Sequence, residues 1–307
     1  MILVTGASGF VGTMLVSRLL REGVGVRLAT RRPFSAPKGA ECTAVGEIGS
    51  ETDWTAALKG IDQVVHLAAR VCVGNESPNA VHPYYAVNAA GAGKLAQAAR
   101  ATGTRSFVLI STTTVYGDRS EGTPFDERSA TSPCTPYAAS KLEGEKVVAQ
   151  ALNRSDCRLV ILRPPLVYGP GAKGNFARLV DLVRQGLPLP LASVRNRRSL
   201  VSVTNLVDAI VLSLGHARAY GTYVVSDGED VSTPQLITMI ARGLGRRARL
   251  FPCPPRAVAL AAQALGFGAA ARRLLGDMAV DCSRIRNELG WQPPVRTADA
   301  ILASLSP

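Results

Sequence analysis

Met1-Ile-Leu-Val-Thr5-Gly6-Ala7-Ser8-Gly9-Phe10-Val11-Gly12 opens the chain and decides its fold. The apolar residues 2–5 predict a buried strand, and the amphipathic stretch 11–22 predicts a helix. A glycine-rich turn between a strand and a helix lets the backbone approach a pyrophosphate, whose charge the helix N-terminus favours. We therefore interpret Gly6, Gly9 and Gly12, with Phe10 and Val11 between them, as a dinucleotide-binding loop.

Alternation of strands and helices continues from this loop to about residue 165. Further strands are predicted at 24–29, 63–67, 106–111 and 158–162, and helices at 53–59, 83–102 and 136–152. Continuous apolar strands separated by helices are typical of a parallel sheet covered on both faces. The sequence thus predicts an α/β fold, with a Rossmann-type doubly wound parallel sheet over residues 1–165.

The composition changes after Pro164-Pro165: proline and glycine become frequent, and the regular alternation of strands and helices ends. The remaining pattern predicts a helix over 203–217, a strand over 220–226 and helices over 233–244 and 255–275. We expect 166–307 to form a smaller mixed α/β substrate-binding region that is partly interleaved with the first domain.

Composition narrows the function classes. The net charge is +12, but the basic residues fall in local pairs and triplets and aromatic residues make up only 5% of the chain. This argues against a nucleic-acid partner and favours a polyphosphate ligand. Six scattered cysteines and three dispersed histidines predict neither a disulfide framework nor a metal site. With no spanning apolar run and no secretory signal pattern, we expect a cytoplasmic protein.

The end of the second strand selects the cofactor in dinucleotide-binding sheets, where an acidic residue favours NAD. This chain instead has Thr30 followed by Arg31 and Arg32. Because two guanidinium groups can pair with a 2′-phosphate, the pattern favours NADP, with NAD as the alternative. A solvated basic turn would give the same sequence.

Tyr137-Ala-Ala-Ser-Lys141 begins a predicted helix, and the spacing of its tyrosine and lysine places both on one helix face. An ammonium beside a phenol lowers the phenol's pKa, which suits it to exchange a proton with a sugar hydroxyl or carbonyl. Upstream, a row of hydroxyl residues ends the strand 106–111, and Thr112 is expected to hydrogen-bond the same substrate oxygen.

These segments together resemble the extended short-chain dehydrogenase/reductases, in the branch of nucleotide-sugar epimerases, dehydratases and reductases. Matching segments extend over nearly the whole chain: 5–12, 66–69, 88, 111–117, 137–141, 163–171, 198–208 and 281–291. The resemblance implies Tyr137 as the acid/base, Lys141 as the residue that holds the nicotinamide ribose, and Thr112 as their partner at the reacting oxygen. Further residues are implied at the cofactor: Glu47, Ile48, Ala68, Ala69, Asn88 and Pro164.

For the substrate, the resemblance implies a nucleotide-linked sugar, with UDP expected as the nucleotide. Asn175 and Arg198 match positions that bind its diphosphate or sugar. One of Arg272 and Arg273 is expected to be a second diphosphate clamp, and Arg273 is the candidate assigned. Dehydratases of this branch carry an Asp-Glu pair directly after the catalytic threonine. Here Thr113, assigned to the substrate site, and Thr114 stand in those positions, so dehydration is not expected.

Two activities remain open, and the Thr30-Arg31-Arg32 turn favours the first. It is NADPH-dependent reduction of a UDP-4-keto-6-deoxy-N-acetylhexosamine for bacterial surface polysaccharide, in which Tyr137 would give its proton to the C4 oxygen. The alternative is an NAD-dependent C4 epimerase of a UDP-sugar. A dinucleotide-binding regulator without turnover is disfavoured, because such proteins commonly lose the Tyr/Lys pair.

Two expectations concern association. The segment 251–276 combines apolar residues with Arg272 and Arg273, so peripheral membrane contact is possible, although a buried core helix is the commoner meaning of such a stretch. The resemblance also implies a homodimer joined by the helices 83–102 and 136–152.

Overall fold

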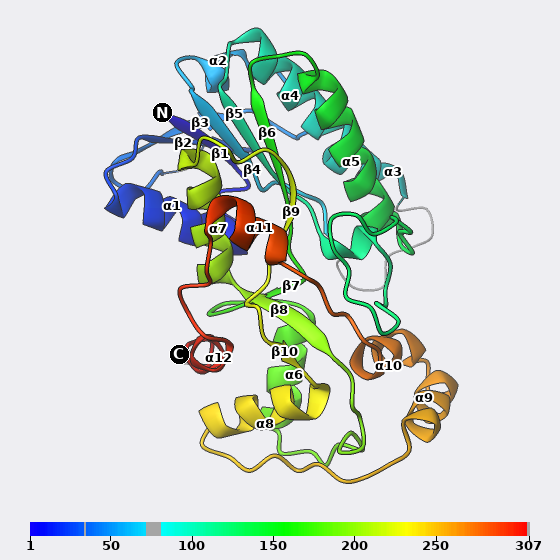
Figure 1. Cartoon of the computed structure of the whole chain (residues 1–307). Helices are drawn as coiled ribbons and strands as arrows, with labels where there is room; N and C mark the ends of the chain where they lie inside the picture. Colours follow the sequence, from blue (N-terminus) through cyan, green and yellow to red (C-terminus); the bar gives the residue numbers. More distant parts are fainter. Residues whose placement is uncertain (34, 72–80, 306–307) are drawn as a thin grey trace.

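A seven-stranded parallel sheet forms the larger part of the molecule in the computed structural model, which describes residues 1–33, 35–71 and 81–305 (Figure 1). Its strand order is β3-β2-β1-β4-β5-β6-β9. The strands are β1 (Ile2–Thr5), β2 (Val26–Thr30), β3 (Ala40–Ala44), β4 (Gln63–His66), β5 (Ser106–Ile110), β6 (Arg158–Arg163) and β9 (Gly221–Val224). The order reverses between β1 and β4, as in doubly wound dinucleotide-binding folds. The predicted fold class is confirmed.

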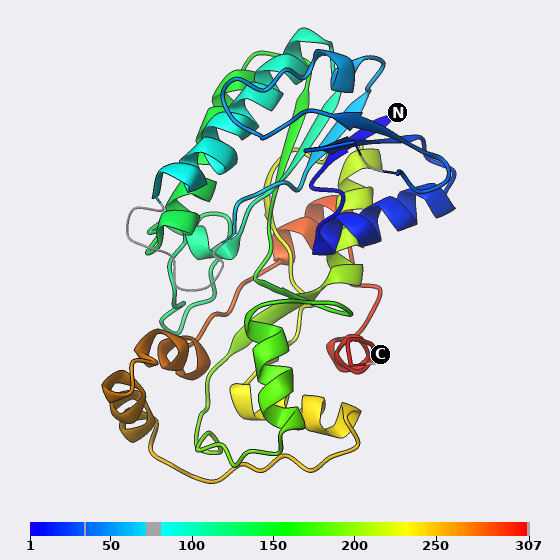
Figure 2. The same ribbon diagram turned by 180° about the vertical axis from the view of Figure 1, so that it is seen from behind.

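Helices cover both faces of this sheet, because its central strands are buried on both sides (Figures 1 and 2). One face packs against α1 (Phe10–Arg21), α7 (Val203–Gly215) and α11 (Ser283–Leu289). The other packs against α2 (Thr55–Leu58), α4 (Ala92–Ala101) and α5 (Pro136–Leu152). The short α3 (Val81–Tyr85) and the π-helical turn η2 (Ala86–Gly91) lead into α4.

A smaller part of the molecule, with its own sheet and core, lies beside the carboxyl edge of the main sheet (Figure 1). It contains a three-stranded sheet in the order β10-β8-β7 and a second core between that sheet and its helices. The strands are β7 (Leu166–Tyr168), β8 (Arg198–Ser202) and β10 (Asp230–Val231), and the helices are α6 (Asn175–Arg184), α8 (Thr233–Gly243), α9 (Pro255–Ala264), α10 (Gly268–Leu275) and α12 (Thr297–Ala303).

The C-terminal half of the chain returns to the main sheet. β9 extends that sheet in register with β6, and α7 and α11 share the core on the α1 face. The predicted division of the chain at residue 165, with a partly interleaved second region, stays a prediction.

The structure contains elements that the sequence did not predict, namely β3, β7, β8, β10, α6, α11 and α12, and it divides one predicted helix. The edge strand β3 was not expected, because its residues alternate only between half-buried and exposed and carry no apolar run. The stretch 255–275 is two helices rather than one, since the chain turns at Leu265-Gly266-Phe267, where Gly266 has a φ of +80°. Within the described ranges, no helix is both long and apolar enough to span a bilayer.

Candidate active site

The glycine loop between β1 and α1 folds so tightly that two of its positions exclude a side chain. Gly6 has a φ of +67°, and a Cβ there would lie 2.7 Å from the backbone nitrogen of Ala68. A Cβ on Gly12 would lie 2.2 Å from the carbonyl oxygen of Gly6. Only glycine fits either position, because such contacts lie far inside van der Waals distance.

The N-terminus of α1 is left open by this turn. Gly9 is its N-cap and provides no side chain to bond the first N–H groups, which belong to a helix beginning with Phe10 and Val11. Exposed N–H groups at a helix N-terminus bind phosphate groups through hydrogen bonds and the helix dipole. The loop therefore fits the pyrophosphate of a dinucleotide.

Backbone beyond β4 forms the wall beside this loop. The N–H of Ala68 donates to Thr5 Oγ1 at 3.2 Å, which holds Ala68 and its neighbour Ala69 against the glycine turn. Asn88 fixes the next residue: its Oδ1 accepts from the N–H of Arg70 at 2.8 Å, and its Nδ2 donates to the carbonyl of Arg70 at 3.0 Å. Nδ2 also donates to Ser140 Oγ at 2.9 Å, so Asn88 ties this wall to the helix of the Tyr/Lys pair.

Thr30, the last residue of β2, lies where the sequence predicts cofactor selection. Its hydroxyl donates to the carbonyl of Arg32 at 2.8 Å. Arg31 forms an exposed ion pair with Glu47 at 3.5 Å, and Ile48 packs beside Gly91 of η2. The structure thus brings these predicted residues to one corner, but with a carboxylate next to one of the two guanidinium groups.

Tyr137 and Lys141 lie in the first turns of α5. Thr135 caps that helix by accepting from the N–H of Ala138 at 3.1 Å, and Pro136 occupies its first position. The ammonium of the buried Lys141 donates to the carbonyl of Ile110, the last residue of β5, at 2.6 Å.

Burial governs the ionisation of both side chains. It raises the pKa of Tyr137 to about 12 and lowers the pKa of Lys141 to about 8. The lowering of the tyrosine pKa that we expected from the neighbouring lysine is therefore outweighed in the protein alone. A charged form of the phenol needs a further positive charge beside it.

Thr112 stands directly after β5 and caps the short helix η3 (Thr113–Val115). Its Oγ1 accepts from the N–H of Thr114 at 3.2 Å and lies 3.0 Å from the hydroxyl of Thr114. The N–H of Thr113 donates to the carbonyl of Pro164 at 3.0 Å, which joins the segments after β5 and β6. The predicted threonine and proline therefore lie at one edge of the sheet.

A buried ion pair joins α5, the helix of Tyr137 and Lys141, to the end of β6. The sequence alone had not indicated a role for it. Arg163, at the end of β6, forms a bidentate pair with Glu145, and its Nη1 donates to the Tyr116 hydroxyl at 2.7 Å. Glu145 lies one turn after Lys141 and acts on that ammonium electrostatically. The regular spacing of Tyr137, Lys141 and Glu145 was the signal that could have revealed it.

Arg198 and Arg273 lie close together, as the diphosphate-clamp prediction requires. Arg198, at the start of β8, donates to the carbonyls of Arg273 and Gly276 at the end of α10. Burial, followed by the nearby charge of Arg273, lowers the pKa of Arg198. Arg119, which the sequence did not single out, has its Nε 3.1 Å from where a Cβ on Gly276 would stand. The side chains of Arg198 and Arg119 thus lie at the C-terminal end of α10, and the charge of Arg273 acts on Arg198. These three arginines form the guanidinium cluster.

Asn175 is not part of this cluster. It is exposed at the first residue of α6, and among the described residues no hydrogen bond or ion pair joins its side chain to Arg198.

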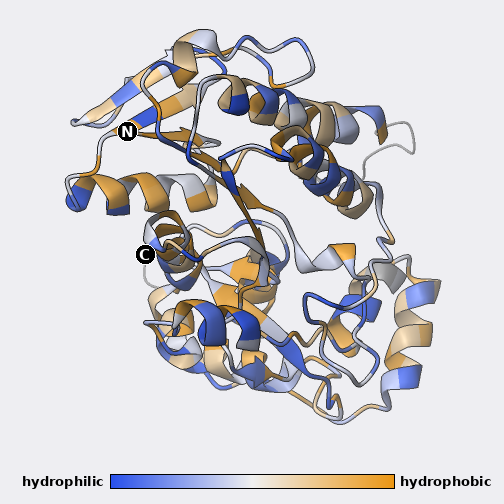
Figure 3. Cartoon of the chain, turned by 45° about the horizontal axis from the view of Figure 1, so that its top comes forward, coloured by the Kyte–Doolittle hydropathy of each residue, from blue (hydrophilic) through white to orange (hydrophobic). Residues whose placement is uncertain are grey.

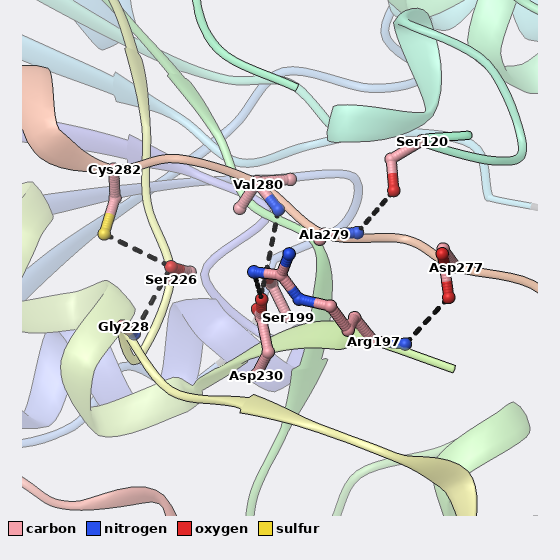
Figure 4. Close-up of polar contacts among 10 residues, drawn as sticks. All are labelled: Ser120, Arg197, Ser199, Ser226, Gly228, Asp230, Asp277, Ala279, Val280 and Cys282. Atoms are coloured by element: carbon pink, nitrogen blue, oxygen red, sulfur yellow. Dashed lines mark hydrogen bonds and ion pairs between the residues drawn. The ribbon is translucent and has the colours of Figure 1, made fainter. Parts of the chain in front are cut away.

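The segment Asp277–Cys282, which follows α10, is bonded to β8 on one side and to the loop that carries Ser120 on the other (Figure 4). On one side, Val280 donates its N–H to Ser199 Oγ in β8 at 2.9 Å, and the Arg197 N–H donates to Asp277 at 2.8 Å. On the other side, Ala279 donates its N–H to Ser120 Oγ at 3.0 Å. Ser120 and Arg119 follow directly on the loop that contains Thr112 and Thr113. These hydrogen bonds therefore hold the guanidinium cluster close to that loop.

A doubly wound sheet with an open glycine loop, and with a Tyr/Lys pair at its carboxyl edge, agrees with the resemblance of the sequence to the extended short-chain dehydrogenase/reductases. The model of the NAD dependent epimerase/dehydratase family matches residues 2–226, and the chain belongs to that family. It is therefore an enzyme.

Individual relatives cover between 80% and 99% of the chain. A UDP-glucose 4-epimerase of Vibrio cholerae is 39% identical over 298 residues, which are 95% of this chain and 90% of that protein. An N-acetyl-alpha-D-glucosaminyl-diphospho-ditrans,octacis-undecaprenol 4-epimerase of Escherichia coli O157:H7 is 28% identical, with 80% of this chain and 73% of that protein covered. The solved UDP-glucuronic acid 4-epimerase from Bacillus cereus, in complex with UDP-glucuronic acid and NAD, shares the fold with a TM-score of 0.79 at 24% identity, covering 99% and 97% of the two chains.

Proposed function

We propose that this enzyme is a C4 epimerase of a UDP-linked hexose that works with bound NAD. The observation that carries the proposal is the 39% identity to a UDP-glucose 4-epimerase over 95% of this chain, a span that includes both the Tyr/Lys pair and the guanidinium cluster. The 4-ketoreductase that the sequence favoured gives way to the epimerase, its stated alternative.

Tyr137 would take the proton of the C4 hydroxyl while the C4 hydride leaves to the bound cofactor. Once the sugar has turned its opposite face to the cofactor and C4 regains the hydride, Tyr137 would return the proton to the same C4 oxygen. Because burial raises the pKa of Tyr137 to about 12, this transfer requires positive charge beside the phenol. The Lys141 ammonium supplies part of it, and a Lys141 pKa of about 8 leaves that ammonium mostly charged at neutral pH. When bound, oxidised nicotinamide supplies further positive charge and the hydride acceptor for C4. Thr112 steadies the same sugar oxygen.

Arg198, Arg273 and Arg119 bind the diphosphate of the substrate, because guanidinium groups form charge-assisted pairs with phosphate oxygens. Holding the nucleotide there leaves the sugar ring free to turn between the two hydride transfers. Asn175 stays a predicted substrate residue, and the homodimer stays a prediction as well.

NAD is favoured over NADP by the ion pair between Arg31 and Glu47, since a carboxylate at this corner repels a 2′-phosphate. Nucleotide released by denaturing the purified enzyme identifies the cofactor directly. NAD is the expected product, and release of NADP would contradict the assignment.

The deciding experiment offers UDP-glucose, and in parallel UDP-N-acetylglucosamine, to the purified enzyme without added reductant. We expect the C4 epimer to form while reduced-nicotinamide absorbance shows no net change. Absence of an epimer from both sugars would reject the proposal.

The 4-ketoreductase is the second candidate, since Arg32 remains a cation beside the strand-two corner and no acidic residue ends β2. It predicts stoichiometric loss of NADPH absorbance with a UDP-4-keto-6-deoxy-N-acetylhexosamine, faster than with NADH.

Replacing Tyr137 by phenylalanine tests the chemistry under either activity. We expect turnover to fall about 10²–10⁴-fold, as for loss of a general acid/base, with cofactor binding nearly unchanged. Steady-state kinetics and cofactor titration measure the two quantities separately. Full activity in the variant would reject Tyr137 as the acid/base.

A further inference from the structure

Helices α9 and α10 form a hairpin at the edge of the smaller part, and the long segment after α8 leads out to it (Figures 1 and 2). No residue of α9 is buried. This corrects the expectation of a core helix for the α9 half of 255–275: Val258 packs only partly against the core of the smaller part, whereas α10 has one buried residue, Ala271, and packs Leu275 against that core.

The outward side of the hairpin is apolar. Leu260 is 70% exposed, Leu265 is 72% exposed and Phe267 is 65% exposed, and Phe251 lies exposed on the approach to α9. Figure 3 shows the apolar middle of α9 at the periphery of the molecule. Single exposed leucines are ordinary, but a cluster of large apolar side chains on one projecting element marks an interaction surface.

The charge around this surface has one sign. From Val231 to Gly276 the chain contains no aspartate or glutamate, whereas it contains arginines at 242, 246, 247, 249, 256, 272 and 273. Arg256 lies on α9 and Arg272 on α10, and both are exposed. The partner that such a surface complements is therefore apolar and anionic at once.

We propose that the hairpin docks the enzyme on an anionic lipid bilayer. Leu260, Leu265 and Phe267 enter the boundary between headgroups and acyl chains, and Arg256 and Arg272 contact lipid phosphates. Helices that lie in the membrane interface combine an apolar side with basic residues in this way, and each basic residue adds to the attraction of an anionic leaflet. No spanning segment is needed for such peripheral binding.

The docking surface is distinct from the proposed catalytic chemistry, although Arg273 belongs to the same hairpin. Leu260 and Leu265 are 70% and 72% exposed and are not among the residues assigned to the reaction, so we expect turnover of a soluble UDP-sugar to be independent of them. Membrane binding is therefore measurable whether or not the enzyme is an epimerase.

Cosedimentation with phospholipid vesicles tests the surface. The full-length enzyme is mixed with vesicles of phosphatidylcholine alone, or with added phosphatidylglycerol, at low and high salt. We expect binding to the anionic vesicles that weakens at high salt, since screening acts on the arginine contribution. The double substitution Leu260→Glu with Leu265→Glu is expected to lower partitioning about tenfold or more.

The matched control is Leu302→Glu, because Leu302 is a 56% exposed leucine on α12, away from the hairpin (Figure 1). Unchanged thermal unfolding of both variants establishes that they fold. Binding by the control and not by the double variant supports the proposal. It is overturned if the parent enzyme ignores anionic vesicles, or if the double variant binds as well as the control. It is also overturned if the double substitution instead dissociates a dimer, which would assign the face to a second copy of the chain.

Discussion

At the scale of single residues, the buried His66 beside the glycine loop shows how the fold controls both geometry and protonation. His66 ends β4 and is 1% exposed, and its Nδ1 lies 2.8 Å from Thr5 Oγ1, the atom that also accepts from Ala68. Burial, with a smaller contribution from the Lys141 ammonium, lowers the pKa of His66 to about 3. The imidazole is therefore neutral at neutral pH.

This histidine makes the folded state acid-sensitive. Between pH 6.5 and about 3 the unfolded chain holds a proton on His66 that the folded chain does not, so stability is lost as pH falls below 6.5. The slope is about 1.4 kcal/mol per pH unit, or roughly 2 kcal/mol between pH 6.5 and pH 5. Urea unfolding at a series of pH values measures it. We expect His66→Gln to flatten the dependence and His82→Gln, at an exposed site, to leave it unchanged; equal slopes in all three proteins would refute the assignment.

At the scale of elements, α5 and β6 are joined by the buried pair of Glu145 and Arg163. Their side chains are only 5% and 9% exposed, and the Arg163 guanidinium also stacks over the Tyr116 ring at 4.8 Å. Because Lys141 lies one turn before Glu145, this contact fixes the catalytic turn of α5 against the strand edge.

Removing one partner of this pair leaves a buried charge uncompensated. We expect Arg163→Met to lower the free energy of unfolding by about 3–5 kcal/mol. The double variant Arg163→Met with Glu145→Gln should recover part of that loss, because it removes both charges. Denaturant unfolding of the three proteins tests the coupling, and additive losses would contradict it.

Elements from three parts of the chain also meet at the guanidinium cluster. The loop after η3 brings Arg119, β8 brings Arg198 and α10 brings Arg273 to the same helix end. If they bind the diphosphate, substitution of each by alanine should raise KM about tenfold, the usual scale of a hydrogen bond between charged groups, with a smaller effect on kcat.

Arg105→Ala provides the comparison, because that arginine is 77% exposed at the opposite end of β5. Its kinetics should match the parent enzyme. An unchanged KM in the Arg119 variant would remove that residue from the proposed clamp while leaving Arg198 and Arg273 to be judged on their own.

At the scale of the whole molecule, the C-terminal half of the chain completes the core and the edge of the main sheet. Buried residues of α7 such as Leu206 and Ile210 pack in one core with Val4 and Val65 of the main sheet, and β9 pairs with β6. An N-terminal fragment that ends at residue 165 exposes this face of the sheet.

We therefore expect one cooperative unfolding transition for the full chain, and no cooperative transition for the fragment 1–165. Calorimetry of the full chain and circular dichroism of the fragment measure the two. Two separated transitions, or a sharply melting fragment, would indicate that the two parts fold independently.

What the sequence determined by itself follows from local rules. The glycine spacing between β1 and α1 and the apolar runs of β4, β5 and β6 specify a doubly wound sheet. The Tyr137–Lys141 spacing specifies one helix face, because helix geometry depends only on the separation of residues. These predictions needed no knowledge of distant contacts.

The tertiary structure alone decided the rest. Two ion pairs, Arg31 with Glu47 and Arg163 with Glu145, join residues from different elements. The hydrogen bond from Arg198 to the Arg273 carbonyl does the same. No local sequence pattern encodes such contacts. Burial, which reverses the expected pKa shift of Tyr137, depends on what the rest of the fold places around the phenol. The same holds for α9: its sequence suits a core helix equally well, and it is exposed because the cores of both parts are completed by other elements.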